Sequence, residues 1–126
     1  MDQAVILSTA RTPIGKAYRG AFNDTDAPTL ASFSIKASIE KADLDPSEIE
    51  DVILGAAVQQ GSQGYNIGRL SAVSSGLPVH VPGMSVDRQC ASGLMAIAIG
   101  AKQIACNEMD VVVAGGVESI SLVQNE

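Results

Sequence analysis

The sequence contains no tryptophan, only two tyrosines and two phenylalanines, a single histidine and two cysteines. With so few aromatic side chains, the protein lacks the stacking platforms that hold single-stranded nucleic acids. Eight basic residues stand against 14 acidic ones, and the net charge of −6 argues against a dedicated phosphate-binding surface. One histidine without a CxxC pair leaves no zinc-ligand set, and two cysteines are too few for a disulfide scaffold. We therefore expect no metal and no nucleic-acid partner.

Long apolar runs are also missing. No segment reaches the roughly 18 to 20 apolar residues of a membrane span, and the N-terminus, MDQAVILSTARTP, has too short an apolar run for a signal peptide. These absences predict no membrane association and a cytoplasmic location. The 126 residues are 46% hydrophobic and 17% charged, which is typical of one globular domain or of part of one.

Apolar runs alternate with helical periodicities along the chain. The pattern predicts strands at residues 4–9, 52–58, 84–86 and 110–115, and helices at residues 28–42, 66–75 and from residue 90 to about 105. Asp26 and Pro28 form a start signal for the first helix. Apolar strands alternating with helices indicate an α/β fold with a mostly parallel sheet and helices on both faces.

The helix expected from residue 90 has almost no polar face. Between Leu94 and Ala105 only Lys102 and Gln103 are polar. A helix that is apolar all round is normally buried all round. We therefore expect it to be covered by a second domain or subunit, and the alternative is an alanine-rich helix with one small-residue face in water.

Cys90 stands where this helix is expected to begin. Unpaired backbone N–H groups and the positive end of the helix dipole stabilise negative charge at such a position. A cysteine there offers a nucleophile together with donors for an oxyanion, which are the two parts that acyl transfer requires. The small residues at 91–93, ASG, leave room for an acyl group. Since buried cysteines are common core residues, position alone leaves catalysis and core packing both open.

Five ordered blocks carry a family resemblance: ARTPIG at 10–15, GSQGYNIGR at 61–69, GLPVHVPGMSV at 76–86, VDRQCASGLMAI at 86–97 and AGGVESIS at 114–121. Together they resemble the N-terminal part of a thiolase, in family order and at family spacing. The resemblance implies a thiolase-like N-terminal half without the loop domain and the C-terminal half. It places an incomplete N-terminal domain at residues 1–118 and the start of the loop-domain segment at 119–126.

The resemblance implies a function for Cys90. In thiolases the cysteine of this block forms an acyl thioester, and its backbone N–H lies in an oxyanion hole. The reaction is thiolysis of 3-ketoacyl-CoA, as in fatty acid β-oxidation, or condensation of acetyl-CoA. Coenzyme A thioesters are substrates, and no bound cofactor is implied. Family members are homo-oligomers that pair through the strand before the cysteine, here MSV at 84–86.

The family's histidine base (GHP-type block), its second cysteine (CxGGG block) and a further oxyanion contact (NEAF-type block) belong to a later part of the subunit. This chain alone is therefore expected to be inactive. The alternative is a non-catalytic thiolase-like module or half-subunit that binds a partner chain. A ketoacyl synthase relative, with the same fold and cysteine, ranks below both because RQCASG and AGGVES are more similar to thiolases.

The other polar candidates are interpreted structurally. Cys106 is expected to be a packing residue, four helical turns from Cys90, and His80 is expected to lie in the lead-in to the strand before Cys90. Arg11 is expected to anchor a turn and Lys16 to face solvent, and the alternative is a phosphate pair for coenzyme A. Met84 and Met95 are expected to fill the core, with lining of an acyl pocket as the alternative. Structural roles are expected for Gln63, Asn66 and Arg69, and helix capping or turn bonding for Glu118 and Ser119. Gly115 and Gly116 are expected to allow a close backbone approach where the last strand leaves the sheet.

Overall fold

The computed structural model describes residues 3–124. Its centre is a parallel sheet of three strands in the order β2-β1-β3, formed by Gly83–Val86, Asp51–Gly55 and Val112–Gly116. In the register of the sheet, Ile53 lies between Met84 on one side and Ala114 on the other. The predicted strands at 52–58, 84–86 and 110–115 are thus confirmed, with shifted ends.

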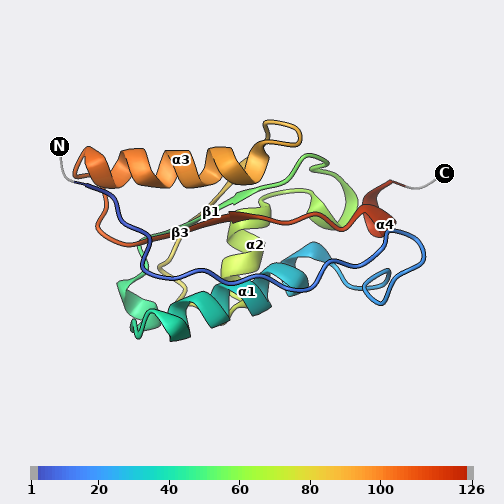
Figure 1. The fold of residues 1–126 in the computed structure, drawn as a ribbon, viewed down its shortest axis with the longest axis horizontal. Helices are drawn as coiled ribbons and strands as arrows, with labels where there is room; N and C mark the ends of the chain where they lie inside the picture. Colours follow the sequence, from blue (N-terminus) through green and yellow to red (C-terminus); the bar gives the residue numbers. More distant parts are fainter. Residues whose placement is uncertain (1–2, 125–126) are drawn as a thin grey trace.

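Helices cover both faces of the sheet. α3 (Ser92–Ala105) lies on one face, and α1 (Ala27–Lys41) and α2 (Ile67–Ser74) lie on the other (Figure 1). Three short helices complete the fold, namely η1 (Pro46–Glu48), η2 (Gly61–Gln63) and α4 (Ile120–Val123). The α/β class predicted from the sequence is confirmed.

α1 begins at the predicted signal. The Asp26 side chain accepts a hydrogen bond from the Thr29 backbone N–H at 2.8 Å, and Pro28 occupies the first turn. Along the inner face of the helix, Ala31, Ile35 and Ile39 are buried at helical spacing. This face joins α1 to the core.

The core lies between the sheet and the helices α1 and α2. Every residue of β1 is buried, because the strand is central in the sheet and has a helix layer on each side. The core cluster consists of aliphatic side chains, including Val52, Leu54, Ile49, Ile67 and Val81. Aliphatic packing of this kind is expected for a chain with so few aromatic residues.

The predicted strand at residues 4–9 is wrong. These residues have no regular secondary structure and run beside α1, to which they are tied by two hydrogen bonds. Ser8 Oγ donates to the Ser38 carbonyl at 2.6 Å, and Lys41 Nζ donates to the Thr9 carbonyl at 3.2 Å. Residues 3–17 and β3 both line a groove of about 990 Å³, and residues 4–9 pair with none of the three strands. An apolar run alone cannot form a strand, since a strand requires a partner.

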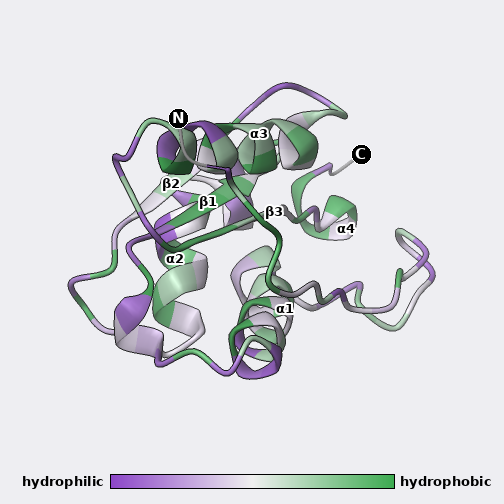
Figure 2. Ribbon diagram, turned by 60° about the vertical axis from the view of Figure 1, so that its left-hand side comes forward, coloured by the Kyte–Doolittle hydropathy of each residue, from purple (hydrophilic) through white to green (hydrophobic). Residues whose placement is uncertain are grey.

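α3 rests on the sheet through small residues. Ser92, Ala96 and Gly100, spaced at i, i+4 and i+8, are its buried residues, and Gly100 faces Val112 and Ala114 of β3. Leu94 on the outer side is 72% exposed. Figure 2 shows the apolar character of the helix. The residues described here cover one face of α3 only, and cover of the other face stays a prediction.

The acidic stretch before β1 is more ordered than a solvated turn. Asp45 and Glu48 form a capping box on η1. The Glu50 carboxylate accepts hydrogen bonds from the backbone N–H groups of Asp110 and Val111. These two bonds hold the pKa of Glu50 below its usual value, and the bond from Asp110 has the larger effect. Glu50 thereby joins the entry of β1 to the entry of β3.

Within residues 3–124 no helix is both long and apolar enough to cross a membrane. The predicted boundary at residues 118 and 119 stays a prediction, and the end of the expected loop-domain segment, residues 125–126, lies outside the described residues.

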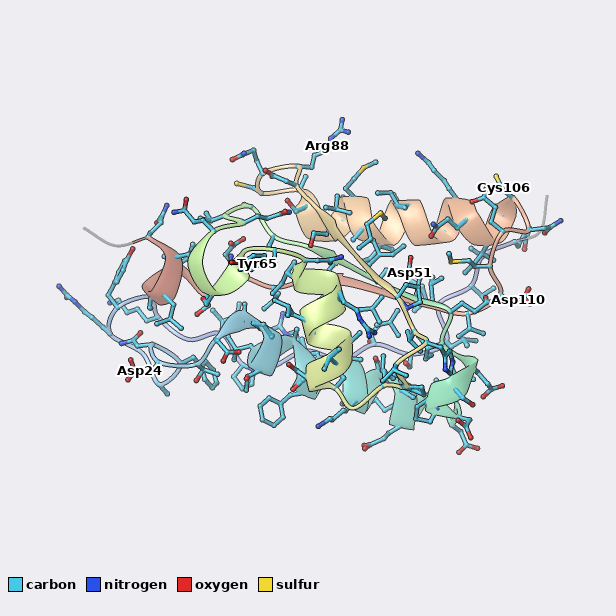
Figure 3. All side chains as sticks on the ribbon, turned by 180° about the vertical axis from the view of Figure 1, so that it is seen from behind. Asp24, Asp51, Tyr65, Arg88, Cys106 and Asp110 are labelled. Carbon is cyan, nitrogen blue, oxygen red and sulfur yellow. The ribbon has the colours of Figure 1, made fainter. Side chains whose placement is uncertain are left out.

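The buried carboxyl group of Asp51 is expected to make the stability of the fold depend on pH. This first residue of β1 is 7% exposed, and burial raises the pKa of its carboxyl group, while the Val52 N–H bond acts in the opposite direction (Figure 3). A raised folded-state pKa means that ionisation opposes folding, so stability falls as the pH rises through the folded pKa. We expect Asp51→Asn to gain stability relative to wild type between about pH 4, the unfolded-state pKa, and neutral pH.

The measurement is urea unfolding of both proteins at several pH values. Asp24→Asn, at an exposed aspartate, controls for the loss of one charge. A stability difference between Asp51→Asn and Asp24→Asn that does not change with pH would contradict the prediction.

Candidate active site

The candidate site lies at the end of the sheet formed by the carboxyl ends of its parallel strands. β2 ends at Val86, β1 at Gly55 and β3 at Gly116, and the register places Gly55 beside both of the others. The turn at residues 87–91, which contains Cys90, follows β2 directly. In open α/β sheets ligands bind in the crevice outside the carboxyl ends of the strands. Cys90 is therefore placed at the edge where this fold type binds ligands.

The turn that carries Cys90 is tightly held. The Ala91 N–H donates to the Arg88 carbonyl at 3.1 Å, and the Ser92 N–H donates to the Gln89 carbonyl at 3.0 Å. Gln89 has a φ of 52°, which a non-glycine residue adopts only where its surroundings impose it. The Cys90 side chain is exposed. A constrained turn thus presents an accessible thiol.

Ser92 is the residue that closes the turn. Its hydroxyl accepts from the Arg88 N–H at 2.8 Å and donates to the Gln89 carbonyl at 2.6 Å, and the side chain is buried. The sequence alone indicates for Ser92 only a small residue beside the sulfur. The signal that could have identified it is a serine at the start of a helix, where a hydroxyl commonly bonds nearby backbone groups.

Cys90 does not begin the helix. α3 starts at Ser92, with Ala91 as the N-cap, so Cys90 precedes the first helical residue by two positions. The predicted position in the first turn is wrong because the Ser92 hydroxyl bonds the backbone of Arg88 and Gln89 and keeps residues 88–91 in a separate turn. The thiol still lies next to the N-terminus of α3, where backbone N–H groups are directed outward.

Three glycines bring the start of α3 onto the sheet. A Cβ on Gly55 would lie 2.2 Å from the Ser92 carbonyl carbon, and one on Gly116 would lie 2.9 Å from the Gly93 Cα. Backbone therefore packs on backbone at the ends of β1 and β3. The predicted close backbone approach at Gly115 and Gly116 is confirmed at Gly116 and wrong at Gly115, where a Cβ would meet only Leu54 Cδ2 at 3.8 Å. The sequence does not predict the more demanding contact at Gly55.

Asn66 and Arg69 have structural roles, as expected. Asn66 caps α2 by accepting from the Arg69 N–H at 3.0 Å, and its Nδ2 donates to the Gly83 carbonyl at 2.7 Å at the start of β2. The Arg69 guanidinium donates to the carbonyls of Val81 and Val79. These bonds fix the segment that leads into β2, and through β2 the position of the Cys90 turn.

Glu118 and Gln63 join two loops at the same edge. The Glu118 carboxylate accepts from the Ala57 N–H at 2.9 Å and from the Val58 N–H at 3.1 Å, and also from Gln63 Nε2. Gln63 is 1% exposed and accepts from the Ser119 N–H. The interpretation of Glu118 as a turn-bonding residue is confirmed. Its bonds also explain why β1, predicted to reach residue 58, ends at Gly55.

His80 and Cys106 lie away from Cys90. His80 is exposed and precedes β2, whereas Cys90 follows β2, so the two residues lie beyond opposite ends of this strand. Cys106 is the C-cap of α3, and Figure 3 shows it at the opposite end of this helix from Arg88. A helix of 14 residues is about 21 Å long. The separation is confirmed, but Cys106 is exposed and does not pack in the core.

The remaining candidates add no group to the site. Arg11 and Lys16 are exposed on the N-terminal segment, and Met84 and Met95 are half-buried. Cys90 does not line the groove beside that segment. Within the described residues, no three His, Cys, Asp or Glu side chains gather so as to hold a metal ion.

The chain is a parallel α/β domain that presents an exposed cysteine, in a constrained turn before a helix, at the carboxyl edge of its sheet. The family model described as "Thiolase, N-terminal domain" matches residues 4–126. The chain belongs to the thiolase family.

Named relatives agree with this assignment. The chain is 39% identical to a 3-ketoacyl-CoA thiolase of Bacillus subtilis over 98% of its own length and 32% of the relative's. It is 39% identical to an acetyl-CoA acetyltransferase of Pseudomonas aeruginosa, over 97% of this chain and 30% of the relative. A probable acetyl-CoA acyltransferase of Staphylococcus aureus is 41% identical over 96% of this chain and 30% of the relative. The chain thus spans about a third of the length of these relatives.

The close contact of Gly55 with the backbone of Ser92 is expected to make an added side-chain carbon destabilising. We expect Gly55→Ala to lower the free energy of unfolding by about 1 to 3 kcal/mol, because a backbone contact cannot yield as a flexible side chain can. Gly115→Ala is the matched control, since its Cβ would meet only Leu54 Cδ2 at an ordinary 3.8 Å. Urea unfolding measures both, and equal stability of the two variants would contradict the packing described here.

Proposed function

We propose that this chain carries the nucleophile of a thiolase, which transfers an acyl group between coenzyme A thioesters through a thioester on Cys90. The observation that carries the proposal is the constrained turn that presents the Cys90 thiol beside the start of α3. The family match and the names of the relatives support the reaction class.

The proposed chemistry has two half-reactions. In thiolysis the Cys90 thiolate attacks the keto carbon of a 3-ketoacyl-CoA, the carbon–carbon bond breaks, and the departing acetyl-CoA carbanion takes up a proton. The thiolate of free coenzyme A then attacks the acyl group and releases Cys90. The reverse sequence condenses two acetyl-CoA molecules. The second step exchanges the thioester on Cys90 for a thioester of coenzyme A, so a cysteine nucleophile keeps it readily reversible.

The backbone N–H of Cys90 is proposed as one donor of the oxyanion hole. Backbone N–H groups near a helix N-terminus stabilise the negative charge that develops on the carbonyl oxygen. Coenzyme A thioesters enter this scheme as substrates, with no bound cofactor.

The described residues offer Cys90 no base. His80 lies before the start of β2, beyond the opposite end of the strand from Cys90, and Cys106 lies at the far end of α3. A positioned base typically contributes about 10²- to 10⁴-fold to the rate. We therefore propose that the chain alone performs only the first half-reaction, and that it does so slowly. The alternative is a non-catalytic thiolase-like module or half-subunit that binds a partner chain, and the apolar outer side of α3 supports it.

We further propose that the protein forms homo-oligomers through β2. Within residues 3–124 this strand pairs with β1 alone and leaves its other edge unpaired. An unpaired edge strand is a template for pairing with another chain. A cytoplasmic location and a role in fatty acid β-oxidation are proposed with the family function.

The proposed thioester on Cys90 should be detectable as a covalent acetyl adduct. After incubation with acetyl-CoA or acetoacetyl-CoA, we expect intact-mass spectrometry to find one acetyl group on wild type and on Cys106→Ser. Cys90→Ser should carry none, because the thiol is the proposed acceptor. Circular dichroism verifies that each variant is folded. A folded wild-type chain that stays unmodified would overturn the nucleophile assignment for this chain and favour the non-catalytic module.

If the protein dimerises through the free edge of β2, removal of a backbone N–H from that edge should weaken the dimer. The Val86 carbonyl accepts from Ala56 on the β1 side, and successive residues of a strand alternate in direction, so the Ser85 N–H points to the free edge. We expect Ser85→Pro to raise the dimer dissociation constant about tenfold or more, since it removes an N–H at the interface. Ser85→Ala, which keeps the N–H, should dimerise as wild type does. Sedimentation equilibrium compares them, and equal dissociation constants would exclude pairing through this edge.

A further inference from the structure

Glu118 lies just past β3, and its side chain bonds the loop that follows β1. One carboxylate oxygen accepts from the Ala57 N–H at 2.9 Å, and the other accepts from the Val58 N–H at 3.1 Å and from Gln63 Nε2. All three partners are donors. An ionised carboxylate satisfies them together, and hydrogen bonds to charged groups are stronger than those between neutral groups.

Gln63 fixes the other side of this contact. Its Nε2 also donates to the Val58 carbonyl at 2.7 Å, and its Oε1 accepts from the Ser119 N–H. The Ser119 hydroxyl donates to the Thr25 carbonyl at 2.9 Å. The buried amide therefore has only one orientation that satisfies its neighbours, and this orientation presents an N–H to Glu118.

The loop that Glu118 holds is joined to the Cys90 turn. The Ala56 N–H, one residue before the Glu118 contacts, donates to the Val86 carbonyl at 3.0 Å. Val86 is the last residue of β2, and the turn at residues 87–91 follows it. On the other side of β1, the Val117 N–H donates to the Gly55 carbonyl at 3.0 Å. A continuous set of bonds thus runs from Glu118 through residues 55–58 to the start of the Cys90 turn.

We propose that Glu118 is a positioning residue for the Cys90 site, acting through the backbone of Ala57 and Val58. Its carboxylate fixes the end of β1, against which β2 ends and the cysteine turn begins. The inference rests on the proposed function only in its consequence for acyl transfer, whereas the mechanical link is independent of the reaction.

The test compares Glu118→Ala and Glu118→Gln with wild type by residue-resolved amide hydrogen exchange of the 126-residue chain. In Glu118→Ala we expect exchange at Ala57 and Val58 to accelerate about tenfold or more, because both N–H groups lose a charged acceptor. If the link is real, the amides of Ala91 and Ser92, which close the Cys90 turn, also exchange several-fold faster. Glu118→Gln keeps the size and one acceptor oxygen, so its effect should be intermediate.

Two controls separate positioning from general destabilisation. Glu108→Gln makes the same chemical change at an exposed residue beyond the far end of α3 and should leave the exchange rates unchanged. Amides of Ile35 and Ile39, in the buried face of α1, report on global stability. Unchanged exchange at Ala91 and Ser92, or equal acceleration at all sites including α1, would overturn the proposal. If Glu118→Ala does not fold, the isosteric Gln variant decides by the same criteria.

Acetylation of Cys90 by acetyl-CoA supplies the functional arm. We expect Glu118→Gln to acetylate several-fold more slowly than wild type while Glu108→Gln keeps the wild-type rate, since small losses of alignment reduce rates strongly. A wild-type chain that is not acetylated would refute the proposed function, and the exchange experiment would still decide whether Glu118 positions the turn.

Discussion

The candidate site depends on direct backbone contact between the start of α3 and the ends of β1 and β3. Gly55, Gly93 and Gly116 have no Cβ, and this allows the first residues of the helix to lie against the sheet. The preceding turn must then leave β2 and reach the helix within residues 87–91. That short distance constrains the backbone at Gln89 and exposes the Cys90 side chain. An exposed, fixed thiol is thus a consequence of close packing beneath it.

Hydrogen bonds from other parts of the chain hold this contact in place. Ser92 closes the turn from the helix side, Asn66 fixes the entry of β2, and Glu118 fixes the loop after β1. In each case a side chain bonds backbone groups of another segment, so the geometry does not depend on one flexible pair of side chains. Such supporting bonds are what a reactive group needs, because its own contacts must remain available for a substrate.

Much of the fold follows from local sequence signals, while long-range contacts do not. The Asp26 and Pro28 signal predicts α1, and the apolar runs predict β1, β2 and β3, because capping and alternation act within a few residues. Residues 4–9 carry an equally strong apolar run and form no strand, since strand formation needs a neighbour with which to exchange hydrogen bonds. The sequence predicts Cys90 as the nucleophile, which stays a prediction, while the roles of Ser92 and Gln63 depend on partners that only the folded chain brings together.

Two of the unpaired surfaces, the free edge of β3 and the outer face of α3, favour association for related physical reasons. β3 pairs with β1 alone within the described residues and borders the groove beside residues 3–17, while α3 leaves Leu94 72% exposed. An open sheet edge and an apolar helix face both favour association, since unpaired backbone groups and apolar area gain by leaving water. The chain spans about a third of its relatives' length, and the Cys90 turn joins β2 to α3. Contacts that cover these surfaces would also hold the cysteine turn more rigidly, so assembly and reactivity of Cys90 are expected to be coupled in this fold.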